Sequence, residues 1–471
     1  MKSSVICAPP YAFAAGLRSL RFWLLALMLC SLAMLSACGG GSGDRRNIEP
    51  PASVIYGTLQ ALYVTTEAIT PNTPQVAGGV ASTFSVSPAL PAGLSLDTQT
   101  GIISGTPTAI QTQATYTVTA SNSGGAAQTQ IRLAVTGRGS WSATAPILPG
   151  RHYFALVRLP SGKALAIGGY TSSGITNSVA LYNPATASWS SMAPMLHPRS
   201  DPSATVLQNG QVLVSGGETT GEVSTSTSEI YDPVTNTWAA AGSMSEARTR
   251  HTATLLPNGK VLVIGGYSRA GVVTFSARAE LYSPATDTWT LLNTPLTNSR
   301  GQHAAELLPD GSAVVVIGGV NSLGFVTTTE LFPVNDSGST MPVAGAIPSG
   351  NVYTSVRLTD GSVLAMSDGS TTTVRFHPAT ASWTTSTLSS PVTRTLPTMT
   401  TLADGRVLLA GGGSLNTAEI YNPDDNVWTT AAPMLTARRA GSAVLLSDGS
   451  VLVVGGWSAA GEIDVVERYL P

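Results

Sequence analysis

Six arginines stand at corresponding places in repeats of about 48 residues along the last two-thirds of the chain. A guanidinium is a permanent cation with five N–H donors, so a circle of them could hold an anionic or polyhydroxyl ligand. The same groups could instead bond loop carbonyls or neighbouring carboxylates, and the sequence leaves both interpretations open. The six are Arg151, Arg199, Arg248, Arg300, Arg394 and Arg438, while Asn351 takes this place in the fifth repeat.

Two histidines follow these arginines by three residues. His251 and His303 occupy equivalent positions in adjacent repeats, and His152 begins the matching segment of the first repeat. Imidazoles could ligate a transition metal. No carboxylate recurs beside them, however, so we expect no metal site and assign His251 and His303 to the same ligand-binding surface as the arginines.

One carboxylate is out of place in the repeat pattern. Glu306 stands where other repeats carry Thr or Val, and Arg158 and Arg357 share a late position of the same segment. An acid and arginines lining a channel could handle a polar substrate, or they could simply pair with one another. Glu306 is therefore the one candidate catalytic residue.

The elements that must position these groups are short strands. Val261 to Ile264 is a continuous apolar run that follows an Asn-Gly pair, a sequence that favours a tight hairpin, and it ends at a double glycine. Tyr282 and Trp289 mark two further strands. Four antiparallel strands per repeat make a propeller blade, which must stack on its neighbours to bury its apolar surface. The double glycines are Gly168-Gly169, Gly216-Gly217, Gly265-Gly266, Gly318-Gly319, Gly411-Gly412 and Gly455-Gly456.

This pattern resembles the kelch repeat over residues 141–471. The fifth unit departs from it, because Met366-Ser367-Asp368-Gly369 stands where the double glycine should be. The last unit ends without its Trp strand, while Trp141 precedes the first unit without a blade of its own. We therefore expect an all-β, seven-bladed propeller over residues 138–471, closed by the Trp141 strand. A six-bladed ring would require the fifth unit to be something else.

A smaller β domain is expected before the propeller, over residues 52–137. Thr115 to Thr119 alternates polar and apolar residues, as a half-buried strand does. The sequence of Leu90 to Asp97 and of Thr100 to Pro107 resembles a family of Ig-like domains of bacterial surface proteins. This resemblance implies a small antiparallel β-sandwich. Relatives of that family include calcium binders, but Glu67 and Asp97 are the segment's only acids. We expect a spacer.

The N-terminus carries targeting signals. The apolar run from Phe22 to Leu35 is shorter than the roughly 20 residues of a membrane span and is typical of a signal peptide, residues 1–37. Leu35 to Cys38 resembles the bacterial lipobox, which implies a lipid on Cys38, a flexible tether over residues 38–51 and anchoring in the outer membrane. An ordinary signal peptide with a chance cysteine is the alternative.

Composition and cysteine usage narrow the function. The net charge is -2 and no basic run occurs, so nucleic acid is not an expected partner. The copper radical galactose oxidases, a kelch-like enzyme group, require a cofactor in which a cysteine is joined to a tyrosine. All three cysteines of this chain (Cys7, Cys30, Cys38) precede the folded domains, so that cofactor cannot form in the propeller. We expect a lipid-anchored protein of the bacterial cell envelope that binds an envelope or extracellular protein or glycan without a cofactor. The alternative is a carbohydrate-active enzyme resembling the sialic acid mutarotases.

Overall fold

The computed structural model describes residues 48–137, 139–334, 340–345, 347 and 352–471. Every regular element in these ranges is a β-strand. Within them, no helix is long and apolar enough to span a membrane. The signal peptide, Cys38 and Asn351 lie outside the described residues.

The first domain is a small β-sandwich. One sheet has the order β2-β8-β7-β4, and the pairs β1–β3 and β5–β6 accompany it. The predicted alternation is confirmed in β7, where Tyr116, Val118 and Ala120 are buried. The sheet is not purely antiparallel as expected, because β2 pairs with β8 in parallel. The strands are β1 (Pro51–Tyr56), β2 (Gln60–Val64), β3 (Pro74–Gly78), β4 (Thr83–Ser87), β5 (Leu94–Leu96), β6 (Ile103–Gly105), β7 (Gln111–Asn122) and β8 (Gly125–Thr136).

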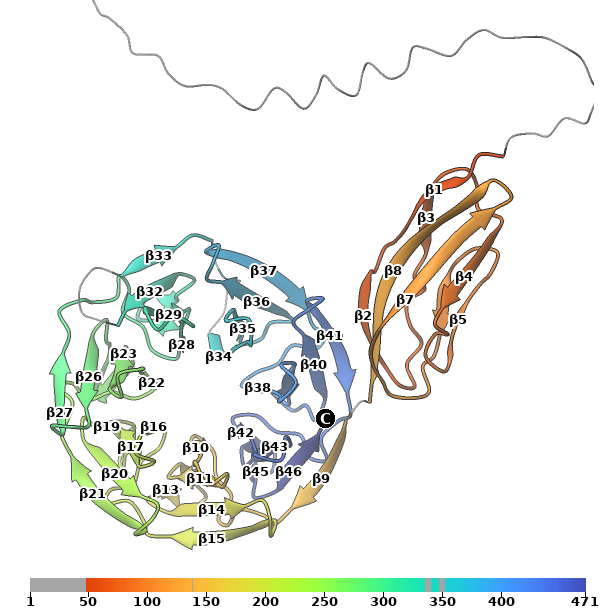
Figure 1. Ribbon diagram of the computed structural model, residues 1–471. Coiled ribbons are helices and arrows are strands. Elements are labelled where there is room, and N and C mark those ends of the chain that lie inside the picture. The colour runs from red at the N-terminus through yellow and green to blue at the C-terminus, as the bar shows by residue number, and fades with distance from the viewer. Residues whose placement is uncertain (1–47, 138, 335–339, 346, 348–351) are drawn as a thin grey trace, which may run out of the picture. The chain divides into compact units, whose positions relative to one another are not determined.

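The second domain is a ring of seven four-stranded antiparallel sheets, or blades (Figure 1). The innermost strands surround the ring axis and are β10 (Ala155–Arg158), β16 (Ser203–Val206), β22 (Thr252–Leu255), β28 (Ala304–Leu307), β34 (Val352–Arg357), β38 (Thr398–Thr401) and β42 (Ser442–Leu445). The second strands are β11 (Ala164–Ile167), β17 (Val212–Ser215), β23 (Val261–Ile264), β29 (Ala313–Ile317), β35 (Val363–Ser367), β39 (Val407–Ala410) and β43 (Val451–Val454).

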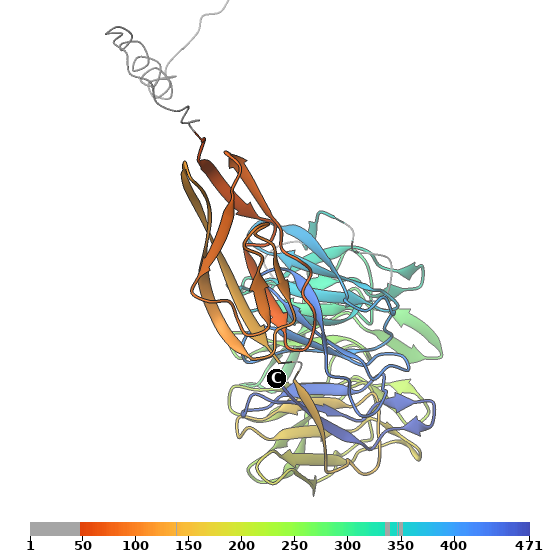
Figure 2. The ribbon, with the colours of Figure 1, turned by 90° about the vertical axis from the view of Figure 1, so that its right-hand side faces the viewer.

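The third strands are β14 (Val179–Asn183), β20 (Ser228–Asp232), β26 (Ala279–Ser283), β32 (Thr329–Pro333), β36 (Thr372–His377), β40 (Ala418–Asn422) and β46 (Val466–Leu470). The outer strands are β15 (Ser188–Met192), β21 (Thr237–Ala241), β27 (Thr288–Leu291), β33 (Met341–Val343), β37 (Ser382–Thr387), β41 (Val427–Ala431) and β9 (Ser140–Thr144). Figure 2 shows the ring of blades from the side.

Five blades also carry a small hairpin between their second and third strands. These hairpins are β12 (Tyr170–Thr171) with β13 (Gly174–Ile175), β18 (Glu218–Thr219) with β19 (Val223–Ser224), β24 (Tyr267–Ala270) with β25 (Val272–Phe275), β30 (Val320–Asn321) with β31 (Gly324–Phe325), and β44 (Trp457–Ser458) with β45 (Gly461–Glu462). In all five, the first hairpin strand also bridges to the loop that enters the blade, as in His152 with Tyr170. Hairpins and entry loops therefore form one rim of the ring.

The predicted closure of the ring is confirmed. β9 pairs with β46, so that Trp141 faces Tyr469 and the first propeller strand completes the last blade. The Trp141 indole N–H also donates a hydrogen bond to the carbonyl of Ala432 in the preceding blade, at 2.6 Å. The first and last strands of the propeller, which are far apart in sequence, are thus joined by β-sheet pairing and by a hydrogen bond between blades.

Burial between blades explains the continuous apolar runs. All four residues of β23 are buried, as are those of β11, β17, β39 and β43. Leu165 and Ile167 of one blade pack in a single cluster with Val212 and Val214 of the next. Each second strand is covered on both faces, which is why an isolated blade could not bury its surface.

The double glycines permit a close approach of backbones on this rim. Gly265 has a φ of 61°, and a Cβ there would lie 2.5 Å from the carbonyl oxygen of Arg300. The next residue, Gly266, donates its N–H to that same carbonyl at 2.8 Å. The pair is therefore structural, because it lets the loop entering the next blade lie against the second strand.

Candidate ligand-binding mouth

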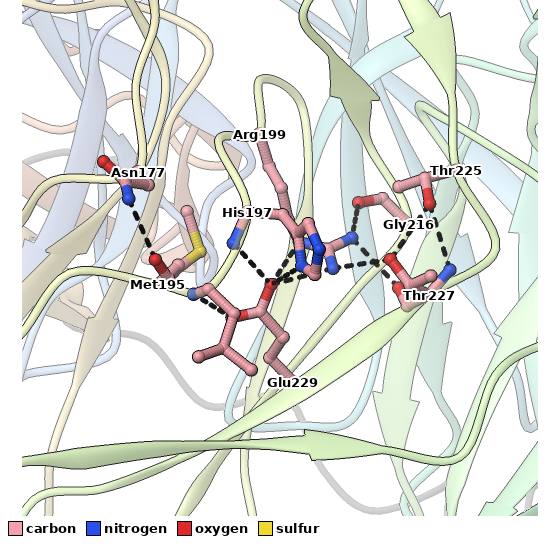
Figure 3. Close-up of polar contacts among 9 residues, drawn as sticks. Asn177, Met195, His197, Arg199, Gly216, Thr225, Thr227 and Glu229 are labelled. Carbon is pink, nitrogen blue, oxygen red and sulfur yellow. Dashed lines mark hydrogen bonds and ion pairs between the residues drawn. The ribbon is translucent and has the colours of Figure 1, made fainter.

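The six repeated arginines are buried, and of the two interpretations that the sequence left open they follow the second, bonding loop carbonyls and carboxylates rather than lining the opening. Their side chains are at most 2% exposed. Arg199 is typical: its Nη1 donates to the carbonyls of Gly216 at 2.9 Å and Thr227 at 3.0 Å (Figure 3). The same contacts recur for Arg151, Arg248, Arg300, Arg394 and Arg438, each of which ties its entry loop to the first glycine of the double-glycine pair.

A buried glutamate completes this contact in five blades. Glu229 Oε1 lies 3.0 Å from Arg199 Nη2, and its two oxygens accept the loop N–H groups of Leu196 and His197 (Figure 3). The repeat pattern alone did not single out these acids as partners of the arginines, although each stands two residues before the Tyr or Phe of the third strand. The five pairs are Arg199–Glu229, Arg248–Glu280, Arg300–Glu330, Arg394–Glu419 and Arg438–Glu467.

The first blade keeps the arginine without the acid. Ala180 stands at the glutamate position, and Arg151 Nη2 donates instead to the Ser178 hydroxyl at 3.0 Å. Burial lowers the pKa of Arg151 to about 10. The loop position that in blade 2 offers the His197 N–H is here Pro149, which has no N–H to satisfy.

The two histidines do reach the ring opening, but as neutral, hydrogen-bonded groups. His251 Nε2 lies 2.9 Å from the Ser203 hydroxyl of the preceding blade, and His303 Nε2 lies 3.0 Å from that of Thr252. Burial lowers the pKa of both imidazoles to about 3, with the nearby arginine charges adding to the effect. In the described part of the chain, no group of three or more His, Cys, Asp or Glu could hold a metal ion.

The residues presented to the opening stand two positions after each buried arginine. All six have a left-handed backbone, with φ between 49° and 54°, and all line a cavity of about 500 Å³ at the ring axis. They differ from blade to blade, in contrast to the invariant arginines beneath them. We call this set the mouth: Tyr153, Asp201, Arg250, Gln302, Leu396 and Ala440.

Backbone hydrogen bonds between neighbouring blades hold the mouth in place. The Asp201 N–H donates to the Tyr153 carbonyl at 2.7 Å, and the Ala440 N–H donates to that of Leu396 at 3.0 Å. Only the positions, not the residue types, repeat. Sequence reasoning could have found them by looking two residues past each arginine, but it had no chemical signal to follow.

Charge at the mouth is concentrated on one side. Arg250 Nε bonds Asp201 Oδ2 at 3.0 Å, and its guanidinium lies 4.9 Å from the centroid of the Tyr153 ring. Burial raises the pKa of Asp201 above its ordinary value, although Arg250 opposes the rise. Arg269 on β24 pairs with Glu218 and Glu222 at 3.5 Å each. These cations are therefore already matched by the protein's own acids.

Glu306 lies on the innermost strand β28, in a second hollow of about 570 Å³ that also includes Arg357. Its Oε1 accepts a hydrogen bond from the Ser355 hydroxyl at 2.9 Å. Burial raises the Glu306 pKa, while Ser355 and Arg357 act in the opposite direction. The structure brings Glu306 and Arg357 together, whereas Arg158 does not line this hollow.

Comparisons with known proteins agree with this architecture. Residues 152–369 match the family model of the KLHDC2/KLHL20/DRC7 Kelch-repeats domain, residues 404–435 match the Kelch motif, and residues 47–136 match the model named Putative Ig domain. The chain thus carries an N-terminal Ig domain followed by kelch repeats. In sequence, none of the curated proteins matches the chain.

A solved structure with this propeller fold is a fungal alcohol oxidase of the AA5 family in complex with copper. It is 16% identical, with a TM-score of 0.58 over 71% of this chain and 76% of the oxidase chain. At that identity the likeness concerns the fold alone. The residues present here do not fit a cysteine–tyrosine copper centre, because every cysteine precedes residue 48 and the Nε2 atoms of His251 and His303 face hydroxyls.

Proposed function

We propose that this chain is a lipid-anchored protein of the bacterial cell envelope whose propeller binds a macromolecular ligand, a protein or a glycan, at the mouth. Kelch repeats are in keeping with an interaction propeller. The anchor is a lipid on Cys38, with the Ig domain acting as a spacer. No cofactor takes part in this function.

The observation that carries the proposal is the contrast between two sets of residues on the same loops. The buried arginines are constant in six blades, and they make the same bonds. Two residues later, Tyr153, Asp201, Arg250 and Gln302 all differ and line the central cavity. A rigid frame that presents variable side chains in a concave opening is typical of a binding site.

Site-specific photocrosslinking in intact bacteria tests the location. A photoreactive phenylalanine at Tyr153 should crosslink the full chain to a discrete partner, whereas the same residue at Val234, a 91% exposed turn residue outside the mouth, should not. A glycan array probed with the full chain carrying Cys38→Ser tests the glycan class directly. Equal crosslinking from both positions, or none from Tyr153 together with an empty array, contradicts the proposal.

The anchor is tested separately with an alkyne-tagged palmitate. The wild-type chain should incorporate the label and partition with the membrane fraction, and Cys38→Ala should do neither. Unchanged labelling of Cys38→Ala contradicts lipidation at this residue without affecting the proposal for the mouth.

A second candidate function, catalysis on a carbohydrate in the manner of a mutarotase or epimerase, is favoured by one observation. The raised pKa of Glu306 suits a carboxyl group that exchanges a proton with a substrate. Turnover of free sugars, followed by NMR, should then be abolished by Glu306→Gln in a protein that circular dichroism shows to be folded. Turnover that survives this substitution removes Glu306 from the mechanism.

A further inference from the structure

The first blade holds a buried arginine whose charge is not matched by an acid. In five blades the repeated arginine and the third-strand glutamate occur together as an ion pair. In blade 5 neither is present, because Asn351 and Thr373 stand at the two positions. Blade 1 keeps Arg151 but has Ala180 at the glutamate position. Among the residues that the structure describes, no acid is bonded to Arg151. A buried charge without a partner is strongly unfavourable.

The hydroxyl group of Ser178 does not take the place of the missing acid. It accepts from Arg151 Nη2 at 3.0 Å. In blade 2, Arg199 Nη2 donates to the equivalent hydroxyl of Thr227 at 2.7 Å and also to Glu229 Oε1 at 3.0 Å (Figure 3). Blade 4 has the same double contact. Because each Nη nitrogen of a guanidinium carries two N–H bonds, one donor of blade 1 remains for an acceptor that the glutamate supplies elsewhere.

The guanidinium of blade 1 is otherwise held as in the other blades. Arg151 Nε lies 3.4 Å from the Pro149 carbonyl, and Arg300 Nε lies 3.4 Å from the Asn298 carbonyl at the equivalent place. The Nη1 atoms of both arginines donate to the first glycine of their double-glycine pairs. The difference between blade 1 and the others is therefore confined to the carboxylate.

The entry loop offers a further donor to this place. In blade 2, the N–H of Leu196, three residues before the arginine, donates to Glu229 Oε2 at 2.6 Å. Leu148 stands three residues before Arg151 and has an N–H of its own. A guanidinium and a loop N–H together are typical ligands of a carboxylate.

The place of the missing acid is close to solvent and of a definite size. Ala180 is 8% exposed, whereas Glu229 at the equivalent position is 1% exposed. The cross-strand partner of Ala180 on β15, Ser191, is exposed. A glutamate side chain exceeds an alanine side chain by one CH2–COO⁻ group, which has the size and charge of acetate. The difference between the two side chains thus matches one small carboxylate.

We propose that blade 1 binds a small carboxylate anion, acetate in size, which takes the place of the missing glutamate beside Arg151 and Ala180. One oxygen accepts from Arg151 Nη2 and the other from the Leu148 N–H, as the oxygens of Glu229 do in blade 2. A sulfate or phosphate dianion fits less well, because a single buried cation would leave one of its charges unmatched. The site is separate from the mouth, since neither Arg151 nor Ala180 lines the central cavity.

An acetate titration of the full chain carrying Cys38→Ser tests the proposal. Urea unfolding followed by tryptophan fluorescence reports on the propeller, because residues 52–137 contain no tryptophan. At an acetate concentration about ten times its dissociation constant, the folding equilibrium constant should be about tenfold larger than in sodium chloride of equal ionic strength. Sodium pivalate carries the same charge but is too bulky for the site, so it should act as chloride does.

Two variants remove the site by different chemistry. Ala180→Glu supplies the carboxylate covalently, as in five other blades, and should be more stable than wild type in chloride and insensitive to acetate. Arg151→Met removes the cation and should also abolish the acetate effect, which decides the matter if Ala180→Glu does not fold. Glu229→Ala is the converse: it opens the same space beside Arg199 and should add a second acetate effect of about tenfold.

A direct measurement of binding uses acetate labelled with carbon-13. Its NMR resonance should broaden in the presence of wild type, and excess unlabelled acetate should restore the sharp line. With Ala180→Glu the line should stay sharp. A saturable acetate effect that is absent from Ala180→Glu and Arg151→Met supports the proposal. Equal effects of acetate, chloride and pivalate, an acetate effect that persists in Ala180→Glu, or a sharp acetate line with wild type overturns it.

Discussion

Removal of one buried acid tests whether the arginine–glutamate pairs hold the loops that form the mouth. Glu229 is 1% exposed and accepts hydrogen bonds from two loop N–H groups and from the Arg199 guanidinium. Glu229→Ala leaves Arg199 buried without its counter-ion, and leaves the N–H groups of Leu196 and His197 without their acceptor. The substitution changes nothing that lines the cavity.

The expected cost follows from these contacts. Breaking a buried ion pair by removing one partner costs about 3–5 kcal/mol. The loss of the two N–H hydrogen bonds does not raise the cost above this range, because water can enter the loop once the acid is gone and accept from those N–H groups. Glu229→Gln keeps an acceptor at the same place, so we expect a smaller loss of about 1–3 kcal/mol.

The measurement is urea unfolding of the full chain carrying Cys38→Ser, with the free energy difference taken from the shift in midpoint at unchanged slope. Glu222→Ala is the matched control in the same blade. That side chain is 64% exposed and pairs with Arg269 at 3.5 Å, so its removal should cost less than about 1 kcal/mol. If Glu229→Ala costs no more than Glu222→Ala, the buried pairs do not stabilise the propeller and the reasoning is refuted.

Three further predictions concern ring closure, loop packing and pH. Trp141→Phe loses the N–H bond to the Ala432 carbonyl and should lower the free energy of unfolding by about 1 kcal/mol, with no change expected if the closing strand is dispensable. Gly265→Ala puts a methyl group 2.5 Å from the Arg300 carbonyl at a φ of 61° and should cost about 1–3 kcal/mol, seen as a lower melting temperature than that of Gly174→Ala, where a Cβ meets nothing. Because the pKa of Glu306 is raised in the folded state, that state holds the proton more tightly, so wild-type stability should fall as pH rises from 4.5 through the folded pKa. Glu306→Gln should lack this fall, and identical pH profiles for the two proteins would contradict the raised pKa.

The architecture followed from local patterns that repeat. Apolar runs such as Val261 to Ile264, the Asn-Gly turns and the spacing of Tyr282 and Trp289 are short-range features, and each blade needs only those features to form its sheet. The closing role of Trp141 followed from the same count, since the last unit was one strand short. Periodicity made these predictions robust, because an error in one unit, such as the fifth, is corrected by the others.

The role of the arginines could not be obtained in this way. A repeated arginine is equally compatible with a ligand and with a buried partner, and the partner of Arg199 is Glu229, a residue of the third strand that only folding brings within 3.0 Å. Burial is decided by how adjacent blades cover the entry loops. The mouth residues could not be predicted from the sequence for the opposite reason. Tyr153, Asp201 and Leu396 share no chemistry, only a left-handed backbone and a position at the ring axis. The sequence determines the type of each residue. Whether that residue faces the ring axis is decided only when the seven blades close into a ring.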